Sequence, residues 1–477
     1  MPLVQLPGPV PPGLTGPVVD LFLDLDLSAG RRQGIEEAVR TAIRDGRLAP
    51  GAPLPSSRAL ASDLGVARGT VVDAYAQLAV EGYLAARPGG RTVVASRAVV
   101  PPAPAAPSPP ALPTVDLRAG APDLSAFPAG AWTAAVRSVL SDGPADALDY
   151  AVPRGRPELQ DAVAAYLRRA RGVVARADQV VVGAGFEHLI RTVVAALAAT
   201  GRRVVAMEDP CLPYHRLLVA EAGASVVPVP VDGEGLVVDA LAASGAGAVL
   251  VTPARQALLG ATLGPSRRSA LLAWARATGG PGGIVLEDDY DAELRFDRQP
   301  IGAVQGLDPE RVVYLGTLSK SLAPGLRLGW AVVPDALAGP VDAVLSVHST
   351  VSSLDQLVVA SLLRSQVFDR HLRRMRSAYR RRRDDFVATL AARAPRVWVE
   401  GVAAGLHGLV RWPDGGPTEA AMMAEATARG IGLTGLAAGW HGTPAFPGII
   451  AGYGRVPAHD ARRRFEAFAS LMAGMTS

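Results

Sequence analysis

The chain contains a single lysine, Lys320, although lysine and arginine together number 48. The ε-amino group of lysine can lose its proton, attack an aldehyde and form a Schiff base, and burial lowers its pKa toward that use. Arginine stays protonated and donates hydrogen bonds instead. Keeping one lysine in an arginine-rich chain therefore favours covalent amine chemistry, and the alternative is a chance surface lysine.

The neighbours of Lys320 offer what a phosphorylated aldehyde cofactor needs. Arg327 can clamp a phosphate through two hydrogen bonds, and Thr317 offers a hydroxyl to the same anion. Upstream, "GGIVLEDDYDAELRF" predicts an apolar strand that ends in acids. There, Asp288 can hold a pyridine nitrogen protonated, and Tyr290 can donate to a phenolic oxygen. Pyridoxal 5'-phosphate is the leading candidate for this cofactor.

A glycine turn and three further acids border this set. The stretch "VVVGAGFEHLIRTVVAAL" predicts a strand, a turn and a helix, in that order. Amides at the N-terminus of such a helix form a phosphate seat, and the residues concerned are Ala184, Gly185 and Phe186. The acids around Asp288 are expected to be solvated or to cap local turns, and they are Glu287, Asp289 and Asp291.

The elements that must position these residues form an alternating pattern. Five apolar, strand-like runs are separated by helical stretches, and they span residues 180–182, 204–207, 248–252, 284–286 and 312–315. Alternation of this kind predicts an α/β domain with a mostly parallel sheet covered by helices.

A proline-rich stretch, "AVVPPAPAAPSPPALPTV", divides the chain. Proline at this density favours a semi-rigid extended spacer. We therefore predict a linker over residues 97–114, a small domain over 17–96 and the large α/β domain over 115–477. Residues 1–16 are predicted to be disordered.

The small domain is predicted to contain three helices and a hairpin. Ile35, Ala38, Val39, Ala42 and Ile43 recur at helical spacing, which gives the first helix one apolar face. Ser57 is expected to cap the second helix, which Gly65 ends. The third helix is expected to bury four residues, Val71, Val72, Tyr75 and Leu78.

A helix-turn-helix followed by a wing is typical of DNA binding, because the third helix enters the major groove and wing residues reach phosphates. The alternative is a small protein-interaction domain with solvated arginines. The predicted contacts to operator DNA are Ser57, Arg58, Arg68, Gly69, Thr70, Arg87 and Arg91.

Length and composition limit the remaining classes. A chain of 477 residues predicts two or three domains, and a net charge of +4 does not by itself indicate nucleic-acid binding. One cysteine, Cys211, cannot form an internal disulfide, which favours a reducing compartment. The sequence shows no secretory signal and no apolar run of membrane-spanning length. We expect a cytoplasmic protein.

Two sets of stretches carry a resemblance to a known family. Residues "GRLAPGAPLPSSRALASDLGVARGTVVDAYAQLAVEGYL" are similar to the winged helix of GntR-type bacterial regulators. Residues 115–477 resemble a fold-type I aminotransferase domain with a large and a small subdomain, through "DLRAGAPDLSAFP", "EDDYDAELRF", "GTLSKSLAPGLRLGW" and "AGLHGLV". Joined in this order, the chain resembles the MocR/GabR subfamily of transcription regulators.

The resemblance implies roles for individual residues. Lys320 would form the internal aldimine with pyridoxal phosphate, while Asp288, Tyr290, Thr317 and Arg327 would hold the cofactor. It also implies a homodimer with shared sites, in which Tyr150 reaches the phosphate of the partner subunit. The effector would be pyridoxal phosphate itself, an amine or an amino acid.

The sequence departs from the family pattern around the expected substrate. Leu212 stands where relatives often place an aromatic near the cofactor ring, and Arg255 replaces a histidine. Ile450 stands where aminotransferases usually carry the arginine for the substrate carboxylate. Arg255 and Arg216 could supply a relocated positive charge for the effector, or each could form a structural ion pair. Another family position, His407, is expected to be structural.

Three functions are therefore compared. The favoured one is a pyridoxal-phosphate-dependent transcription regulator. The second is a working aminotransferase with an accessory DNA-binding domain, which the missing carboxylate clamp disfavours. The third is a scaffold whose aminotransferase-like domain only dimerises. An arginine-dense stretch, "RHLRRMRSAYRRRRDDF", is expected to be a solvated helix face rather than a second DNA-binding surface.

Overall fold

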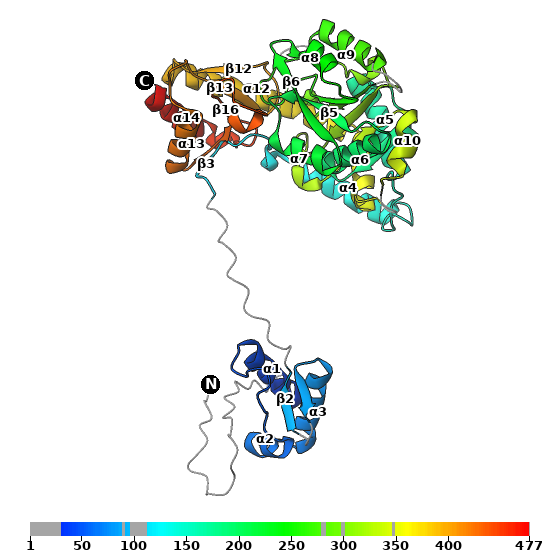
Figure 1. Cartoon of the computed structure of the whole chain (residues 1–477), viewed down its shortest axis with the longest axis vertical. Helices are drawn as coiled ribbons and strands as arrows, with labels where there is room; N and C mark the ends of the chain where they lie inside the picture. Colours follow the sequence, from blue (N-terminus) through cyan, green and yellow to red (C-terminus); the bar gives the residue numbers. More distant parts are fainter. Residues whose placement is uncertain are drawn as a thin grey trace. The chain divides into compact units, whose positions relative to one another are not determined.

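The computed structural model describes residues 30–87, 91–95, 112–277, 283–296, 301–345 and 349–476. The chain divides between Pro110 and Ala111 into two compact units, each of which has its own core. Figure 1 shows both units. The predicted disordered segment 1–16 and most of the predicted linker 97–114 lie outside the described residues, so the domain boundaries remain predictions.

The N-terminal unit is a three-helix domain with a two-stranded hairpin. Its elements are α1 (Arg31–Arg44), α2 (Ser57–Leu64), α3 (Arg68–Val80), β1 (Leu84–Arg87) and β2 (Arg91–Val94), and the two strands pair antiparallel. The predicted apolar face of the first helix is buried, and it packs with residues of α2, α3 and both strands around one core. The predicted helix-turn-helix and wing layout is confirmed.

Two predictions within this unit are wrong. Val72 is 44% exposed, because α3 turns Val71, Ala74, Tyr75 and Leu78 inward and a neighbour of Val71 lies about 100° round the helix. Ser57 does not cap α2. It is the first helical residue, and the Ser56 side chain accepts the capping hydrogen bond from the Ala59 amide.

The C-terminal unit contains an eight-stranded sheet with helices on both faces. The strands are β4 (Val180–Gly183), β5 (Val204–Asp209), β6 (Ser225–Asp232), β7 (Gly235–Leu236), β8 (Ala248–Val251), β9 (Ile284–Asp288), β10 (Val312–Thr317) and β11 (Gly329–Val332). Their order is β4-β11-β10-β9-β8-β5-β6-β7. The central pairs are parallel, whereas β11 and the short β7 run antiparallel to their neighbours. The predicted mostly parallel sheet is confirmed.

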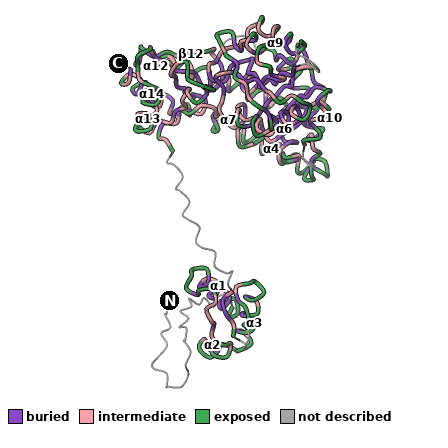
Figure 2. Tube along the Cα trace, in the orientation of Figure 1, coloured by how far each residue is buried: buried purple, intermediate pink, exposed green. Residues whose placement is uncertain are grey.

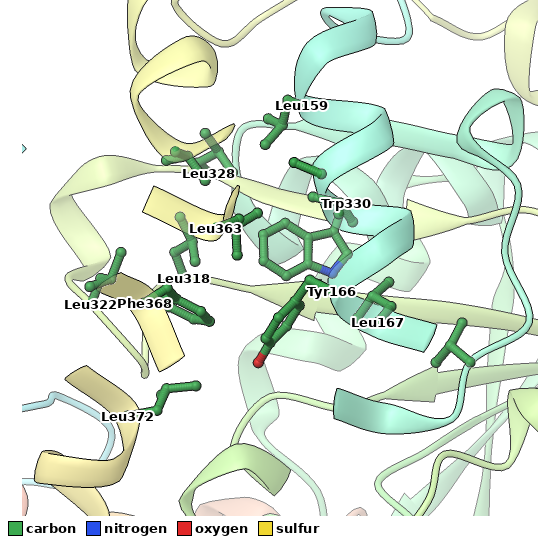
Figure 3. Close-up of a cluster of buried hydrophobic side chains, with 14 of the residues drawn as sticks. Leu159, Tyr166, Leu167, Leu318, Leu322, Leu328, Trp330, Leu363, Phe368 and Leu372 are labelled. Carbon is green, nitrogen blue, oxygen red and sulfur yellow. The ribbon is translucent and has the colours of Figure 1, made fainter. Parts of the chain in front are cut away.

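Alternate residues of these strands enter different cores. Val180, Val182 and Trp330 pack on one face, whereas Val181 and Ala331 pack on the other. Because both faces are covered, the strands are buried and rich in valine and leucine. Figure 2 shows this burial, and Figure 3 shows Trp330 among Tyr166, Leu318, Leu328 and Phe368. The covering helices are α4 (Ala129–Asp142), α5 (Pro157–Arg171), α6 (Gly185–Ala199), α7 (Pro213–Glu221), α8 (Val238–Ala243), α9 (Pro265–Ala277), α10 (Asp335–Asp342) and α11 (Ser353–Arg364).

A smaller sheet forms the second part of this unit. Its antiparallel order is β12 (Trp398–Glu400), β13 (His407–Arg411), β16 (Ile449–Gly452) and β15 (Thr434–Gly435). The helices α13 (Glu419–Ala428) and α14 (Ala461–Thr476) pack with it, and β3 (Val115–Asp116) pairs with β14 (Ile431–Gly432). The long helix α12 (Val367–Arg393) contributes Phe368 to the large core and Phe386 to the small one. It therefore fixes the two subdomains to each other.

Short 3-10 turns connect several of these elements. They are η1 (Leu124–Ala126), η2 (Ala177–Gln179), η3 (Ala292–Leu294), η4 (Gln305–Leu307), η5 (Pro324–Leu326), η6 (Ala437–Gly439) and η7 (Ala458–Asp460). Within the described ranges, no helix is both long enough and apolar enough to span a membrane.

Candidate functional site

A cavity of about 280 Å³ lies where β9 and β10 end. Asp288 is the last residue of β9 and Thr317 the last of β10, and the loops that follow supply Tyr290 and Lys320 to the same cavity. Ligands of parallel α/β sheets bind at the carboxyl ends of strands. The fold therefore brings together Lys320, Asp288, Tyr290, Thr317 and Arg327, all of which line the cavity.

The amine of Lys320 is held at the wall of this cavity. Its Nζ donates to the Gly120 carbonyl oxygen at 2.5 Å. Burial lowers the pKa of Lys320, and the carboxylates of Asp291 and Asp288 offset part of that effect. A lowered pKa increases the neutral fraction of the amine, which is the nucleophilic form. The environment thus suits attack on an aldehyde.

Asp288 is a buried carboxyl that lacks a partner. It is 4% exposed, and within the described residues its side chain makes no hydrogen bond or ion pair. Burial, followed by the nearby Asp289 and Asp291, raises the pKa of Asp288 well above its ordinary value. A cationic ring nitrogen placed in the cavity would satisfy this carboxyl and keep it ionised. The residues present therefore fit a pyridine cofactor.

Tyr290 keeps its phenolic proton. Its hydroxyl oxygen accepts from Arg255 Nη1 at 2.9 Å, and burial raises the pKa of Tyr290 well above its usual range. A protonated hydroxyl beside the cavity can donate to a phenolate oxygen of a ligand.

An anion seat lies beside Lys320. Helix α6 begins at Gly185, its N-cap Ala184 gives no side-chain cap, and Phe186 lines the cavity. A Cβ added at Gly185 would lie 3.7 Å from the Arg327 guanidinium, so this cation borders the amides of the helix start. Arg327 also donates to Glu187 at 3.2 Å. Amides, the Arg327 guanidinium and the Thr317 hydroxyl together can hold a phosphate.

Tyr150 does not line the cavity of its own chain. It is 78% exposed and borders a second hollow, together with residues 147–151 and 349–354. Its predicted role toward a partner subunit remains a prediction.

The two arginines predicted as effector ligands have internal partners. Arg255 is 2% exposed, and besides Tyr290 it contacts Asp291 at 3.1 Å and the His407 carbonyl at 2.7 Å. Arg216 donates to the carbonyls of Gly439 and Ala438 at 2.7 and 2.8 Å. Neither arginine lines the cavity. Breaking a buried ion pair costs about 3–5 kcal/mol, so Arg255 is held where it is.

The acids around Asp288 are buried, so the expectation that they are solvated is wrong, whereas Glu287 does cap a turn. Glu287 accepts from the amides of Val304 and Gln305. Asp289 pairs with Arg171 at 2.7 Å, and Asp291 pairs with Arg255. All three are buried because β9 is a central strand whose end lies under the loops of its neighbours.

Sequence reasoning missed His215, whose aromatic ring lies in the cavity. The His215 imidazole stacks on Phe186 with centroids 4.6 Å apart and planes 29° apart, and both residues line the cavity. Burial and nearby Lys320 lower the pKa of His215 to about 3, so the ring is neutral. His215 follows Leu212 by about one helical turn, and that spacing was the available signal. His407 also lines the cavity, and burial lowers its pKa.

The predicted DNA-contact residues lie on the surface of the winged helix. Arg58, Arg68, Arg87 and Arg91 are exposed, and none forms an ion pair or hydrogen bond within the described residues. Gly69 is exposed and Thr70 partly so, in the first turn of α3, whose N-cap Ala67 provides no side-chain hydrogen bond. Ser57 is partly exposed at the start of α2. Their roles on DNA remain predictions.

Two known families match different parts of the chain. Residues 31–94 match the gntR family of bacterial regulatory proteins, and residues 113–434 match the aminotransferases of class I and II.

Full-length relatives combine the two parts. The HTH-type pyridoxine biosynthesis transcriptional regulator PdxR of Corynebacterium glutamicum is 33% identical over 443 residues, which cover 89% of this chain and 92% of that protein. The probable rhizopine catabolism regulatory protein MocR of Rhizobium meliloti is 31% identical, over 96% of this chain and 97% of its own length.

Solved structures show the same fold in the C-terminal unit. Kynurenine aminotransferase of Pyrococcus horikoshii superposes with a TM-score of 0.68 at 22% identity, and covers 76% of this chain and 91% of its own. Aspartate aminotransferase of Thermus thermophilus gives a TM-score of 0.65 at 21% identity, over 76% of this chain and 92% of its own.

Proposed function

The chain belongs to the MocR/GabR subfamily of gntR-type bacterial transcription regulators, and on this premise we propose that pyridoxal 5'-phosphate bound at Lys320 controls its binding to operator DNA. When bound, this cofactor supplies an aldehyde that condenses with a primary amine and a pyridine ring that withdraws electrons. A regulator that binds operator DNA acts in the cytoplasm, and we propose that location.

One observation carries the proposal. The single lysine of the chain lies in the same cavity as Asp288, a buried carboxyl with no partner within the described residues. In this proposal Lys320 holds the aldehyde carbon and Asp288 holds the ring nitrogen. Tyr290 donates to the phenolic oxygen, and Thr317, Arg327 and the first amides of α6 bind the phosphate.

The cofactor claim is tested by borohydride reduction of the protein incubated with pyridoxal phosphate. Reduction should leave a pyridoxyl group on the peptide that contains Lys320, detected by mass spectrometry. Lys320→Arg keeps the charge but removes the primary amine, and should carry no label. Absence of the label from the wild-type peptide would refute the proposal.

The DNA claim is tested by binding to the upstream region of its own gene at several salt concentrations. A protein that neutralises several phosphates loses affinity steeply as salt rises. A flat salt dependence, or no binding, would contradict the proposal.

The effector we favour is pyridoxal phosphate itself. This choice rests on the relative named for pyridoxine biosynthesis, which is 33% identical over most of the chain. An amine or amino acid that enters the same cavity is the second candidate. Either ligand must bind two arrangements of the regulator with different affinity to alter DNA binding.

We also propose a homodimer. Tyr150 is highly exposed, and so are several apolar residues nearby in sequence, Leu140, Leu148 and Val152. A second copy that covered this surface would bring Tyr150 toward the neighbouring site, and a two-fold dimer would place two winged helices on repeated half-sites. The variants Tyr150→Ala and Leu148→Asp separate the role in cofactor binding from the role in dimer formation, and sedimentation measures the dimer. The first should weaken cofactor binding within a dimer, and the second should weaken the dimer.

The alternative is an active aminotransferase with an accessory DNA-binding domain. It requires repeated turnover of an amino acid and a keto acid by the cofactor-loaded protein. Spectra that show bound cofactor without product accumulation would exclude this function for the donors tested.

A further inference from the structure

Part of the cavity wall is apolar. Ile450 and Leu258 line it, and both belong to one buried cluster against which Leu212 and Ala119 pack. Strand alternation explains the position of Ile450, because its neighbours Ile449 and Ala451 enter the core of the small subdomain instead. Ile450 is in register with Thr434 on β15, which lines the same cavity.

The cavity is lined by fewer cations than acids. The cations are Lys320 and Arg327, and the acids are Glu187, Asp288 and Asp291. Burial lowers the pKa of both lining histidines, so they carry no positive charge near neutral pH. If Lys320 and Arg327 hold the cofactor, as the proposed function requires, no lining cation within the described residues is left for a second ligand.

The nearest other cations are committed to buried contacts. Arg255 neutralises Asp291 and donates to the His407 carbonyl, while Arg216 fixes the carbonyls of Gly439 and Ala438. Moving Arg255 toward a ligand would leave the buried Asp291 carboxylate without its partner. A ligand carboxylate in this cavity would therefore lose its hydration without gaining a positive charge.

We propose that this pocket selects against carboxylates and takes small apolar primary amines that lack one. The apolar body of the amine would pack on Ile450, Leu258 and Leu212. This inference rests on the proposed function, because it assigns Lys320 and Arg327 to the cofactor.

Matched ligands test the selection directly. Binding of 3-methylbutylamine and of leucine, which differ by the α-carboxylate, is measured by calorimetry on the full-length, cofactor-loaded protein. We expect the amine to bind about tenfold or more tightly, because the leucine carboxylate would be buried without a charged partner. The pair 2-phenylethylamine and phenylalanine repeats the test with a larger body.

A gain of function sharpens the test. Ile450→Arg would place a cation on the apolar wall and should tighten leucine binding about tenfold relative to the wild type. Ile450→Met keeps the wall apolar and should retain the preference for the amine. Since Ile450 is fully buried, Thr434→Arg, at a partly exposed position in register with it, is the second variant if the first does not fold.

The outcomes separate the two claims. Leucine binding as tightly as the amine, or neither ligand binding at millimolar concentration, overturns the inference. Borohydride labelling of Lys320, in a cofactor-loaded sample to which no amine has been added, is the second readout. Label without amine selectivity refutes only the inference, whereas absence of label refutes the proposed function.

Discussion

Arginine is used in opposite ways in the two units of this protein. On the winged helix, Arg58, Arg68, Arg87 and Arg91 are exposed and make no ion pair within the described residues. In the C-terminal unit, Arg171 and Arg255 are buried and each neutralises a buried carboxylate. An unpaired exposed guanidinium is available to an external anion, whereas a buried pair maintains the structure. Whether an arginine has an internal partner therefore distinguishes arginines that could bind a ligand from arginines that stabilise the fold. The net charge of the chain does not make this distinction.

Not every arginine of the winged helix is available. Arg40 pairs with Glu81 at 2.8 Å, and Arg44 donates to the Tyr83 hydroxyl at 2.8 Å. These two residues join α1 to the segment after α3, and they serve as internal controls for the unpaired arginines of the same unit.

The largest effect is expected from breaking the buried pair. Arg255→Met leaves Asp291 buried without a partner and should lower the free energy of unfolding by about 3–5 kcal/mol. Chemical denaturation followed by fluorescence measures this loss. Adding Asp291→Asn removes the unpaired charge and should recover part of it. If Arg255→Met were as stable as the wild type, the buried arginine would not maintain the structure, and the contrast between the two units would be wrong.

An arginine-to-methionine substitution on the winged helix should weaken DNA binding and leave the stability of the protein nearly unchanged. Arg68→Met is expected to weaken operator binding by about 1–3 kcal/mol if, as predicted, the start of α3 faces base edges. Stability should change by less than about 0.5 kcal/mol, as at other exposed sites. Arg44→Met is the control, with a smaller effect on DNA binding. Equal DNA affinity for Arg68→Met and the wild type would contradict the assignment.

Lys320 differs from every arginine because it can lose its charge. Burial lowers the pKa of Lys320, so the reactive neutral amine forms at lower pH than for a solvated lysine. Below that pKa, the rate of pyridoxal phosphate capture should rise about tenfold per pH unit and then level off. Stopped-flow absorbance gives the profile, with Nα-acetyl-lysine as the reference. If the midpoint of the pH–rate profile of Lys320 lay at or above that of Nα-acetyl-lysine, the surroundings of Lys320 would not lower its pKa.

The smallest effect concerns the start of the recognition helix. Ala67→Ser would add a side-chain cap to α3, worth about 1 kcal/mol. Hydrogen exchange of residues 68–80, followed by mass spectrometry on the full chain, should become slower. Unchanged exchange would mean that this helix start is already satisfied in another way.

The cavity residues and the central strands could be predicted from the sequence. Lys320, Asp288, Tyr290, Thr317 and Arg327 were identified together because their chemical types occur at strand ends, and the parallel sheet brings those ends to one edge. The five predicted strands were found because strands buried on both faces form continuous apolar runs.

Predictions failed where the surroundings of a side chain decide its role. Glu287, Asp289 and Asp291 are expected to be solvated or to cap local turns, yet all three are buried and their partners come from distant segments such as Arg171 and Val304. Val72 looked apolar and therefore buried, but the helix phase turns it outward. The His215 ring was missed because its contact with Phe186 depends on how α6 and α7 pack.

The central claim is that occupancy of Lys320 controls DNA binding. The direct measurement is the affinity for the operator, with and without pyridoxal phosphate at fixed salt, of the wild type and of Lys320→Arg. The account predicts that the cofactor changes the affinity of the wild type and leaves that of the variant unchanged. An equal change in both proteins, or no change in the wild type, would contradict it.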